Sequence, residues 1–137
     1  MRHAARSCKQ NIVEGISDGT VSVEMCIKLL GVARGSAREL LEDYQDFLRQ
    51  NDLEIWQLND QRTFKARDYC RSHDDPKDFI GKCKERSDET VANIMITQLR
   101  QIDAMLADVL KKKEQEFLES GGVKEAMFKA RKDRRGD

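Results

Sequence analysis

The chain has 137 residues, of which 36% are charged and 6% are aromatic, and it contains a single proline. This composition is typical of proteins built from long helices and disfavours a β-sandwich or barrel. The 25 basic and 25 acidic residues cancel, which disfavours a globally basic nucleic-acid binder but not a local basic patch. No stretch reaches the roughly 18 consecutive apolar residues of a membrane helix, and no apolar signal region opens the sequence. We therefore expect a cytoplasmic protein without a membrane partner.

Two amphipathic helices are predicted in the first 52 residues. The first covers residues 2–14 and is interrupted by Gly15 and by the run 17–19. The second is expected to begin near Thr20 or Ser22, either of which can cap it, and to end near Asn51. Its apolar face comprises Val23, Cys26, Leu30, Ala33, Ala37, Leu40, Leu41, Tyr44, Phe47 and Leu48.

Three residues of this second helix need an explanation. Glycine costs about 1 kcal/mol relative to alanine inside a helix, so Gly31 and Gly35 either admit another body from the side or lie on a flank that faces water. The sequence leaves both options open. Arg34 projects near the middle of the apolar face and needs a carboxylate or a path to water. Glu14, at the end of the preceding helix, is its predicted partner.

The second half of the chain is expected to contain one more long helix. Residues 53–58 are predicted to form an apolar clamp, followed by a short helix around 60–72, and Pro76 is expected to close that segment. Ser87 can cap a helix whose core face continues from Val91 to Phe117. The pair Gly121–Gly122 is expected to end this helix, and a basic tail follows.

These elements predict an all-α protein, an antiparallel up-down bundle of the four-helix-bundle type with two long helices and a C-terminal helical extension. The two long helices, at about 30 residues each, would both span about 45 Å and match in length. We expect one domain. Within it, residues 1–52 form bundle helices, residues 53–86 connect the halves through a short helix, and residues 87–137 form the long helix and basic tail.

Two segments resemble a known family. The stretches A-A-R-S-C-K-Q-N-I-V-E-G at 4–15 and V-A-R-G-S-A-R-E-L-L-E-D-Y-Q-D-F-L-R-Q at 32–50 resemble the bacterial four-helix-bundle proteins named after the 23S rRNA intervening sequence. Residues 92–106 and 117–127 are similar to a subgroup with a four helix bundle suffix region. The resemblance implies a structural motif and a homo-oligomer, often a pentamer. The motif consists of Asn11, Glu14, Gly15, Ala33, Arg34, Gly35, Ser36 and Glu39.

The resemblance also implies a missing element. In that family a complete amphipathic helix precedes the segment equivalent to residues 2–14, whereas Met1 lies here where that helix would already be running. Its absence would leave an apolar groove along the remaining helices. Three explanations stay open: a truncated or mis-assigned start, which we favour, a helix supplied by another chain, or occupation of the gap by residues 53–86.

No cofactor, metal or catalytic residue is predicted. The four cysteines form no C-x-x-C pair and are expected to be free thiols, although Cys70, His73 and Cys83 would supply three metal ligands. A metal-dependent bundle enzyme is a remote alternative, because the Glu-x-x-His motif of such enzymes does not occur. Carboxylates of the second helix more simply balance Arg34, Arg38 and Arg49 at helical spacing; they are Glu39, Glu42, Asp43 and Asp46.

The favoured function is a non-catalytic assembly or interaction protein that associates with itself and contacts a protein or RNA partner. The alternative is an accessory protein that binds RNA through basic termini. A distant relative in the family is such an accessory, to a reverse transcriptase, and contacts nucleic acid through a basic surface. Phosphate contacts require clustered cations, and two clusters qualify, one of Arg2, Arg6 and Lys9 and one of Lys129, Arg131, Lys132, Arg134 and Arg135.

Overall fold

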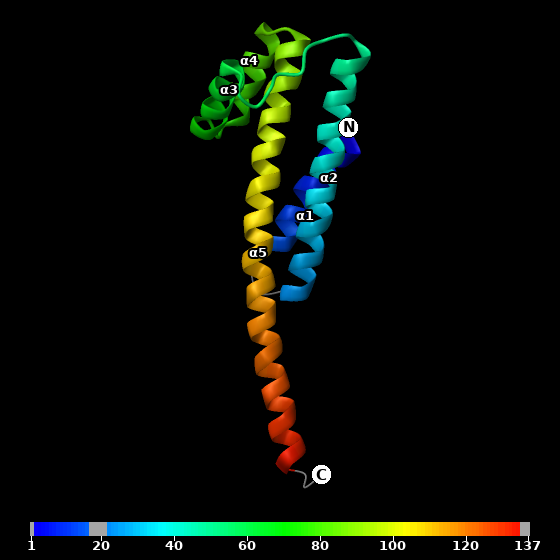
Figure 1. Ribbon diagram of the computed structural model, residues 1–137, viewed down its shortest axis with the longest axis vertical. Helices are drawn as coiled ribbons and strands as arrows, with labels where there is room; N and C mark the ends of the chain where they lie inside the picture. The colour runs from blue at the N-terminus through cyan, green and yellow to red at the C-terminus, as the bar shows by residue number, and fades with distance from the viewer. Residues whose placement is uncertain (1, 17–21, 135–137) are drawn as a thin grey trace.

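The computed structural model describes residues 2–16 and 22–134, with side chains described as far as Glu119. Every regular element in this part of the chain is a helix (Figure 1), which confirms the all-α prediction. The helices are α1 (Arg2–Ile16), α2 (Val23–Gln50), α3 (Gln61–Ser72), α4 (Pro76–Glu85) and α5 (Asp88–Arg134).

Three helices form the body of the molecule. Helix α1 packs on α2, and α2 packs along α5 in the opposite direction (Figure 1). Helices α3 and α4 lie on the other side of α5 near its start, and α3 packs against α5 (Figure 1). Whether residues 53–86 occupy the gap of a missing first helix stays a hypothesis; their two helices lie on the side of α5 that faces away from α2. The up-down pattern is seen for these three helices, without a fourth beside them in the described residues.

The main core lies where α1, α2 and α5 meet. Small residues at its centre let the helix axes approach closely, since Ala33 is 0% and Ala37 1% exposed. The buried cluster comprises Ala4, Cys8, Leu30, Ala33, Ala37, Leu40, Leu99 and Leu106. A second cluster of Leu48, Ala92 and Ile96 joins the other end of α2 to the start of α5. Periodicity predicted the buried face of α2 and the burial of Leu99 and Leu106 on α5, but it missed Ala92 and Ile96, and Phe117 at the end of the predicted α5 face is 41% exposed.

Two helix ends differ from expectation. Pro76 does not simply close the α3 segment, because it occupies the first turn of α4, where its missing N–H costs nothing. Asp75 caps α4, and its side chain accepts a hydrogen bond from the N–H of Lys77 at 2.9 Å. Helix α5 runs through Gly121–Gly122 to Arg134, so the prediction that these glycines end it is wrong. Strong helix formers on both sides outweigh two glycines.

Gly15 lies in a crowded position and Gly31 and Gly35 in open ones. This decides whether the flank of Gly31 and Gly35 admits another helix or faces water. Within the described residues, a Cβ at either would have no neighbour within 4 Å, whereas one at Gly15 would lie 3.1 Å from Cγ of Leu30. The flank of Gly31 and Gly35 is thus open in this chain. Gly15 is a position where the backbone of α1 lies close to α2.

We therefore expect substitutions at these glycines to have opposite signs. Gly31→Ala should raise the free energy of unfolding by up to about 1 kcal/mol through helix propensity. Gly15→Val should lower it by about 1–3 kcal/mol, because branched carbons would overlap Leu30 and force α1 away. Urea unfolding followed by circular dichroism measures both. A stabilising Gly15→Val would contradict the described α1–α2 contact.

Candidate functional site

Arg34 is neutralised from α5. Its Nε donates to Oδ1 of Asp103 at 2.8 Å, and Nε of Arg38 lies 3.3 Å from the same oxygen. The hydrogen bond from Arg34 holds the pKa of Asp103 below its ordinary value, assisted by the positive charge of both arginines. The predicted pairing with Glu14 is wrong, because Arg34 turns toward α5 while Glu14 lies on an exposed flank of α1, where it accepts from Gln10 at 3.0 Å.

This ion pair predicts a pH-dependent stability. The Asp103 pKa is lowered in the folded state, so its contribution is complete above the ordinary value near 3.8 and is lost as pH falls through the folded value. Asp103→Asn should lower the urea midpoint at neutral pH, and the gap to the parent should close as pH falls below 3.8 through the lowered pKa of Asp103. Asp46→Asn is the control, since Asp46 pairs with Arg49 in exposed positions. A gap that persists unchanged in acid would contradict the ion pair.

Two further motif residues, Asn11 and Ser36, both form hydrogen bonds with Ser7 at the α1–α2 contact. Ser36 of α2 donates to Oγ of Ser7 at 3.0 Å, and the amide of Asn11 donates to the Ser7 carbonyl at 2.7 Å. Ser7, which sequence reasoning did not single out, therefore connects the motif segment of α1 with that of α2. Gly35 and Glu39 are exposed and take no part in this contact.

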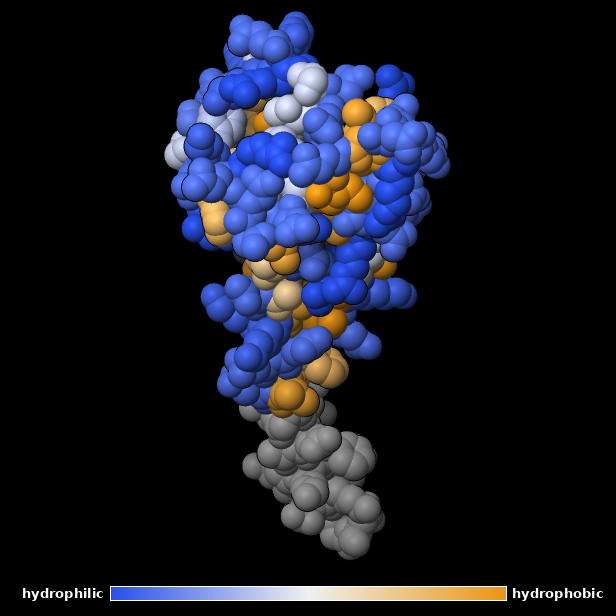
Figure 2. All heavy atoms as spheres, turned by 45° about the horizontal axis from the view of Figure 1, so that its top comes forward, coloured by the Kyte–Doolittle hydropathy of each residue, from blue (hydrophilic) through white to orange (hydrophobic). Residues whose placement is uncertain are grey.

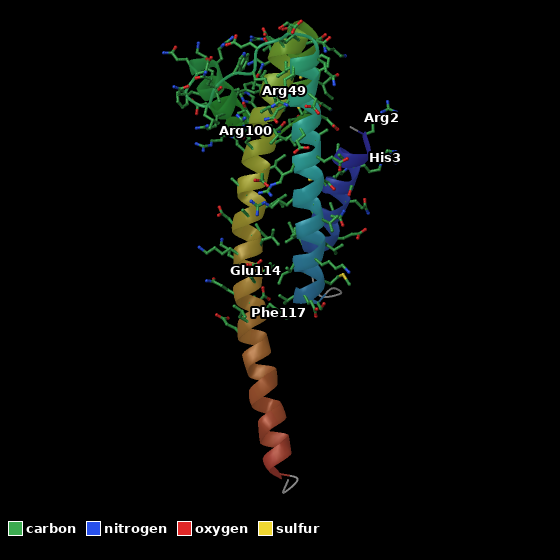
Figure 3. All side chains as sticks on the ribbon, turned by 45° about the vertical axis from the view of Figure 1, so that its right-hand side comes forward. Arg2, His3, Arg49, Arg100, Glu114 and Phe117 are labelled. Carbon is green, nitrogen blue, oxygen red and sulfur yellow. The ribbon has the colours of Figure 1, made fainter. Side chains whose placement is uncertain are left out.

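The two predicted basic clusters are not brought together. Arg2, Arg6 and Lys9 are exposed on α1, and Figure 3 places Arg2 far along the long axis from the end of α5. The side chains of Lys129, Arg131, Lys132 and Arg134 lie outside the described part, as does all of Arg135. The described cations of α1 form a solvent-exposed face.

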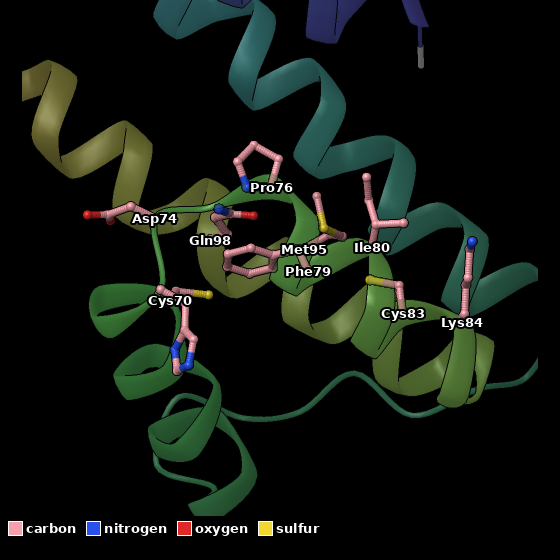
Figure 4. Close-up of a pocket in the computed structure, with 10 residues that line it drawn as sticks. Cys70, Asp74, Pro76, Phe79, Ile80, Cys83, Lys84, Met95 and Gln98 are labelled. Carbon is pink, nitrogen blue, oxygen red and sulfur yellow. The ribbon is translucent and has the colours of Figure 1, made fainter.

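The potential metal ligands line one cavity of about 620 Å³ between α3, α4 and α5. Cys70 and Cys83 lie on either side of Phe79, and Met95 of α5 lies beside Phe79 (Figure 4). His73 stacks on Tyr69, with ring centroids 3.9 Å apart. Burial raises the pKa of the Cys70 thiol, which keeps it protonated at neutral pH. No three acidic, cysteine or histidine side chains in the described residues are grouped closely enough to hold a metal ion.

A second cavity, of about 360 Å³, has a very different lining. Four cations and two aromatic rings surround it, and its lining is Trp56, Arg62, Lys65, Ala66, Tyr69, Lys82, Arg86, Thr90 and Ile94. The guanidinium of Arg62 lies 4.9 Å from the Trp56 ring centroid, and Nζ of Lys82 lies 3.8 Å from that of Tyr69. We call this cavity the basic pocket. Sequence reasoning did not find it.

Asn93 fixes the wall of the basic pocket. Its Oδ1 accepts from the backbone N–H of Trp56 at 2.9 Å, and its Nδ2 donates to the carbonyls of Glu54 and Glu89, each at 2.8 Å. Asn93 is only 2% exposed. One buried amide thus ties the extended linker between α2 and α3 to the first turns of α5.

A third candidate surface for binding, after the two cavities, is the projecting part of α5. Within residues 111–119 no side chain is buried, and Phe117 and Leu118 are 41% and 71% exposed. Figure 3 shows Phe117 at the level where α2 begins, and Figure 2 shows apolar atoms on the stem just before its grey end. We call residues 111–119 the overhang. It continues the apolar face of α5 past the point where α2 covers it.

Comparison with protein-family models, with curated proteins and with solved structures gives no match. The described helices include none with the length and apolar character needed to cross a membrane. The functional argument therefore depends on the geometry of these surfaces.

Proposed function

We propose that this chain is a non-catalytic helical-bundle assembly protein whose copies associate through the overhang of α5. The observation that carries the proposal is the continuation of one apolar face. Leu106 is 5% exposed against α2, Leu110 packs at the edge of the same cluster, and Phe117 follows seven residues later. Seven residues are about two helical turns, so Phe117 lies on that face where α2 no longer covers it.

A second copy is the occupant that the charges favour. The overhang reads Lys-Lys-Lys-Glu-Gln-Glu-Phe-Leu-Glu, so three cations at 111–113 precede the carboxylates of Glu114, Glu116 and Glu119. Two antiparallel copies bring the basic half of one beside the acidic half of the other, which is a self-complementary, two-fold interface. Parallel copies would place like charges together. The antiparallel pair is therefore the arrangement we propose.

The resemblance to the 23S rRNA intervening-sequence proteins supports self-association by analogy. That family is expected to form pentamers, which require head-to-tail contacts, whereas the overhang pairs two copies. The two assemblies differ in mass by more than twofold. Sedimentation of the purified chain separates them, and a dimer is the result that agrees with the two-fold overhang interface, whereas a pentamer would contradict it.

Substitution of Phe117 tests the proposal. Phe117→Lys should weaken self-association at least tenfold, because burying a Phe side chain is worth about 1.5–3 kcal/mol. Phe64→Lys is the matched control, since Phe64 is 46% exposed on α3 and far from the overhang. Sedimentation equilibrium of both variants and the parent gives the dissociation constants. Equal weakening by both substitutions, or a parent that is monomeric at all concentrations, would contradict the proposed interface.

A further inference from the structure

The basic pocket carries an unbalanced charge. Arg62, Lys65, Lys82 and Arg86 line it, and no carboxylate does. Arg62 is already neutralised, because its Nη2 lies 2.9 Å from Glu54 and 2.8 Å from Asp60. The other three cations form no ion pair with any described carboxylate. Like charges around one cavity repel one another, and this repulsion is relieved when an anion enters.

The three unpaired cations come from different elements. Lys65 lies on α3, Lys82 on α4, and Arg86 at the junction between α4 and α5. Nζ of Lys82 rests over the Tyr69 ring at 3.8 Å, a contact that does not neutralise it. The acidic side chain nearest in sequence to the α5 wall, Glu89, accepts instead from the backbone N–H of Glu54. The Asp78 carboxylate, four residues before Lys82, adds to burial in raising the pKa of Tyr69, so the fold gathers three cations here with one carboxylate near them and no ion pair of their own among the described residues.

A second, independent observation points to a ligand. Trp56 lines the same pocket, and its indole Nε1 is buried with no hydrogen-bond partner among the described residues. Trp56 is 7% exposed overall. Almost all buried polar groups in native proteins have a partner, so an unpaired buried donor requires an explanation. This nitrogen is covered in the described structure, so an anion in the pocket can accept from it only when the side chains over it move aside.

We propose that the basic pocket binds a ligand with two or more adjacent phosphate groups. The cations surround one small cavity of about 360 Å³, which suits a compact polyphosphate group. Both aromatic rings are already engaged, Trp56 by Arg62 and Tyr69 by His73 and Lys82. The cations therefore recognise phosphate by its charge, and the two aromatic rings only form the walls of the pocket. The phosphates belong either to a free compound or to a nucleic-acid strand.

Titration of the full chain with inorganic triphosphate tests this inference. Trp56 is the single tryptophan, so its fluorescence reports on the pocket directly, and calorimetry gives the affinity. The triple variant Lys65→Gln, Lys82→Gln, Arg86→Gln should bind at least tenfold more weakly. Its control is Arg2→Gln, Arg6→Gln, Lys9→Gln, which removes the same charge from exposed positions of α1 and should bind within twofold of the parent. Urea unfolding checks that both variants fold.

A second arm separates the two sources of phosphate. A short single-stranded RNA without a terminal phosphate replaces triphosphate in the same titration. Tighter binding of triphosphate identifies a free compound, and binding of RNA alone, lost in the pocket variant, identifies a strand; both support a phosphate site. The inference is overturned if neither probe binds at low salt, or if the pocket and control variants weaken binding equally. Its failure would leave self-association through the overhang untouched, because the two surfaces share no residue.

Discussion

Replacing Leu30 with alanine is expected to lower the free energy of unfolding by about 3–5 kcal/mol, the largest effect of any single substitution considered for this chain. Leu30 is 0% exposed and belongs to the cluster that joins α1, α2 and α5. It also lies directly beneath Gly15. Removing three side-chain carbons leaves a cavity that the close contact of α1 and α2 cannot fill.

Urea unfolding followed by circular dichroism measures this loss. Leu58→Ala is the control, because Leu58 is 60% exposed and its truncation should change the free energy of unfolding by no more than about 0.5 kcal/mol. Similar losses at both positions would show that Leu30 is not at the centre of the core. A loss of this size is a large fraction of the stability of a domain of this length.

Asn93→Leu is expected to cost about 2–4 kcal/mol and to release the linker before α3. The substitution leaves the buried N–H of Trp56 and the carbonyl of Glu54 without their partners, and each unpaired buried group costs about 1–3 kcal/mol. The Trp56 fluorescence should shift to longer wavelength in the folded variant, because the ring becomes more exposed to water.

Thr97→Val is the matched control for Asn93. Thr97 is buried on the same face one turn later, and its hydroxyl donates only to the carbonyl of Asn93, at 3.0 Å. Its loss should cost no more than about 1.5 kcal/mol. The role of Asn93 as the link between α5 and the linker would be refuted by equal losses at the two positions and an unchanged tryptophan spectrum.

The long helices were predictable because their information is local. Apolar residues recur at helical spacing along α2 and the first half of α5, and Ser22 marks the start of α2, where its Oγ accepts from the N–H of Met25 at 3.2 Å. Helix α4 was missed because it is short and Pro76 was interpreted only as a stop. The Asp75–Pro76 pair, a cap followed by a proline in the first turn, was the signal available.

The partner of Arg34 was not predictable from local pattern. Asp103 lies 69 residues further along the chain, and the pairing depends on how α5 is rotated against α2. Glu14 is at the end of the helix that packs on α2, but it lies on an exposed flank of α1, whereas Arg34 turns toward α5. Periodicity defines which face of a helix is apolar, whereas the rotation of packed helices depends on side-chain shape across the interface.

The basic pocket was missed for a related reason. Its cations are scattered among acids in the sequence and come together through the packing of α3, α4 and α5. A partial signal existed: Arg62, Lys65 and Tyr69 share one face of α3 at spacings of three and four, and Lys82 and Arg86 are four apart. Zero net charge concealed this local excess of positive charge.

The central claim, self-association through the overhang, is tested most directly by reversing its two charged halves. One variant carries glutamate at 111–113 and the other carries lysine at 114, 116 and 119, so each overhang has a single sign of charge. We expect both variants to be monomeric alone and to form a discrete complex when mixed, as measured by sedimentation velocity. The claim is contradicted if either variant alone associates as the parent does, or if the mixture stays monomeric while the parent associates.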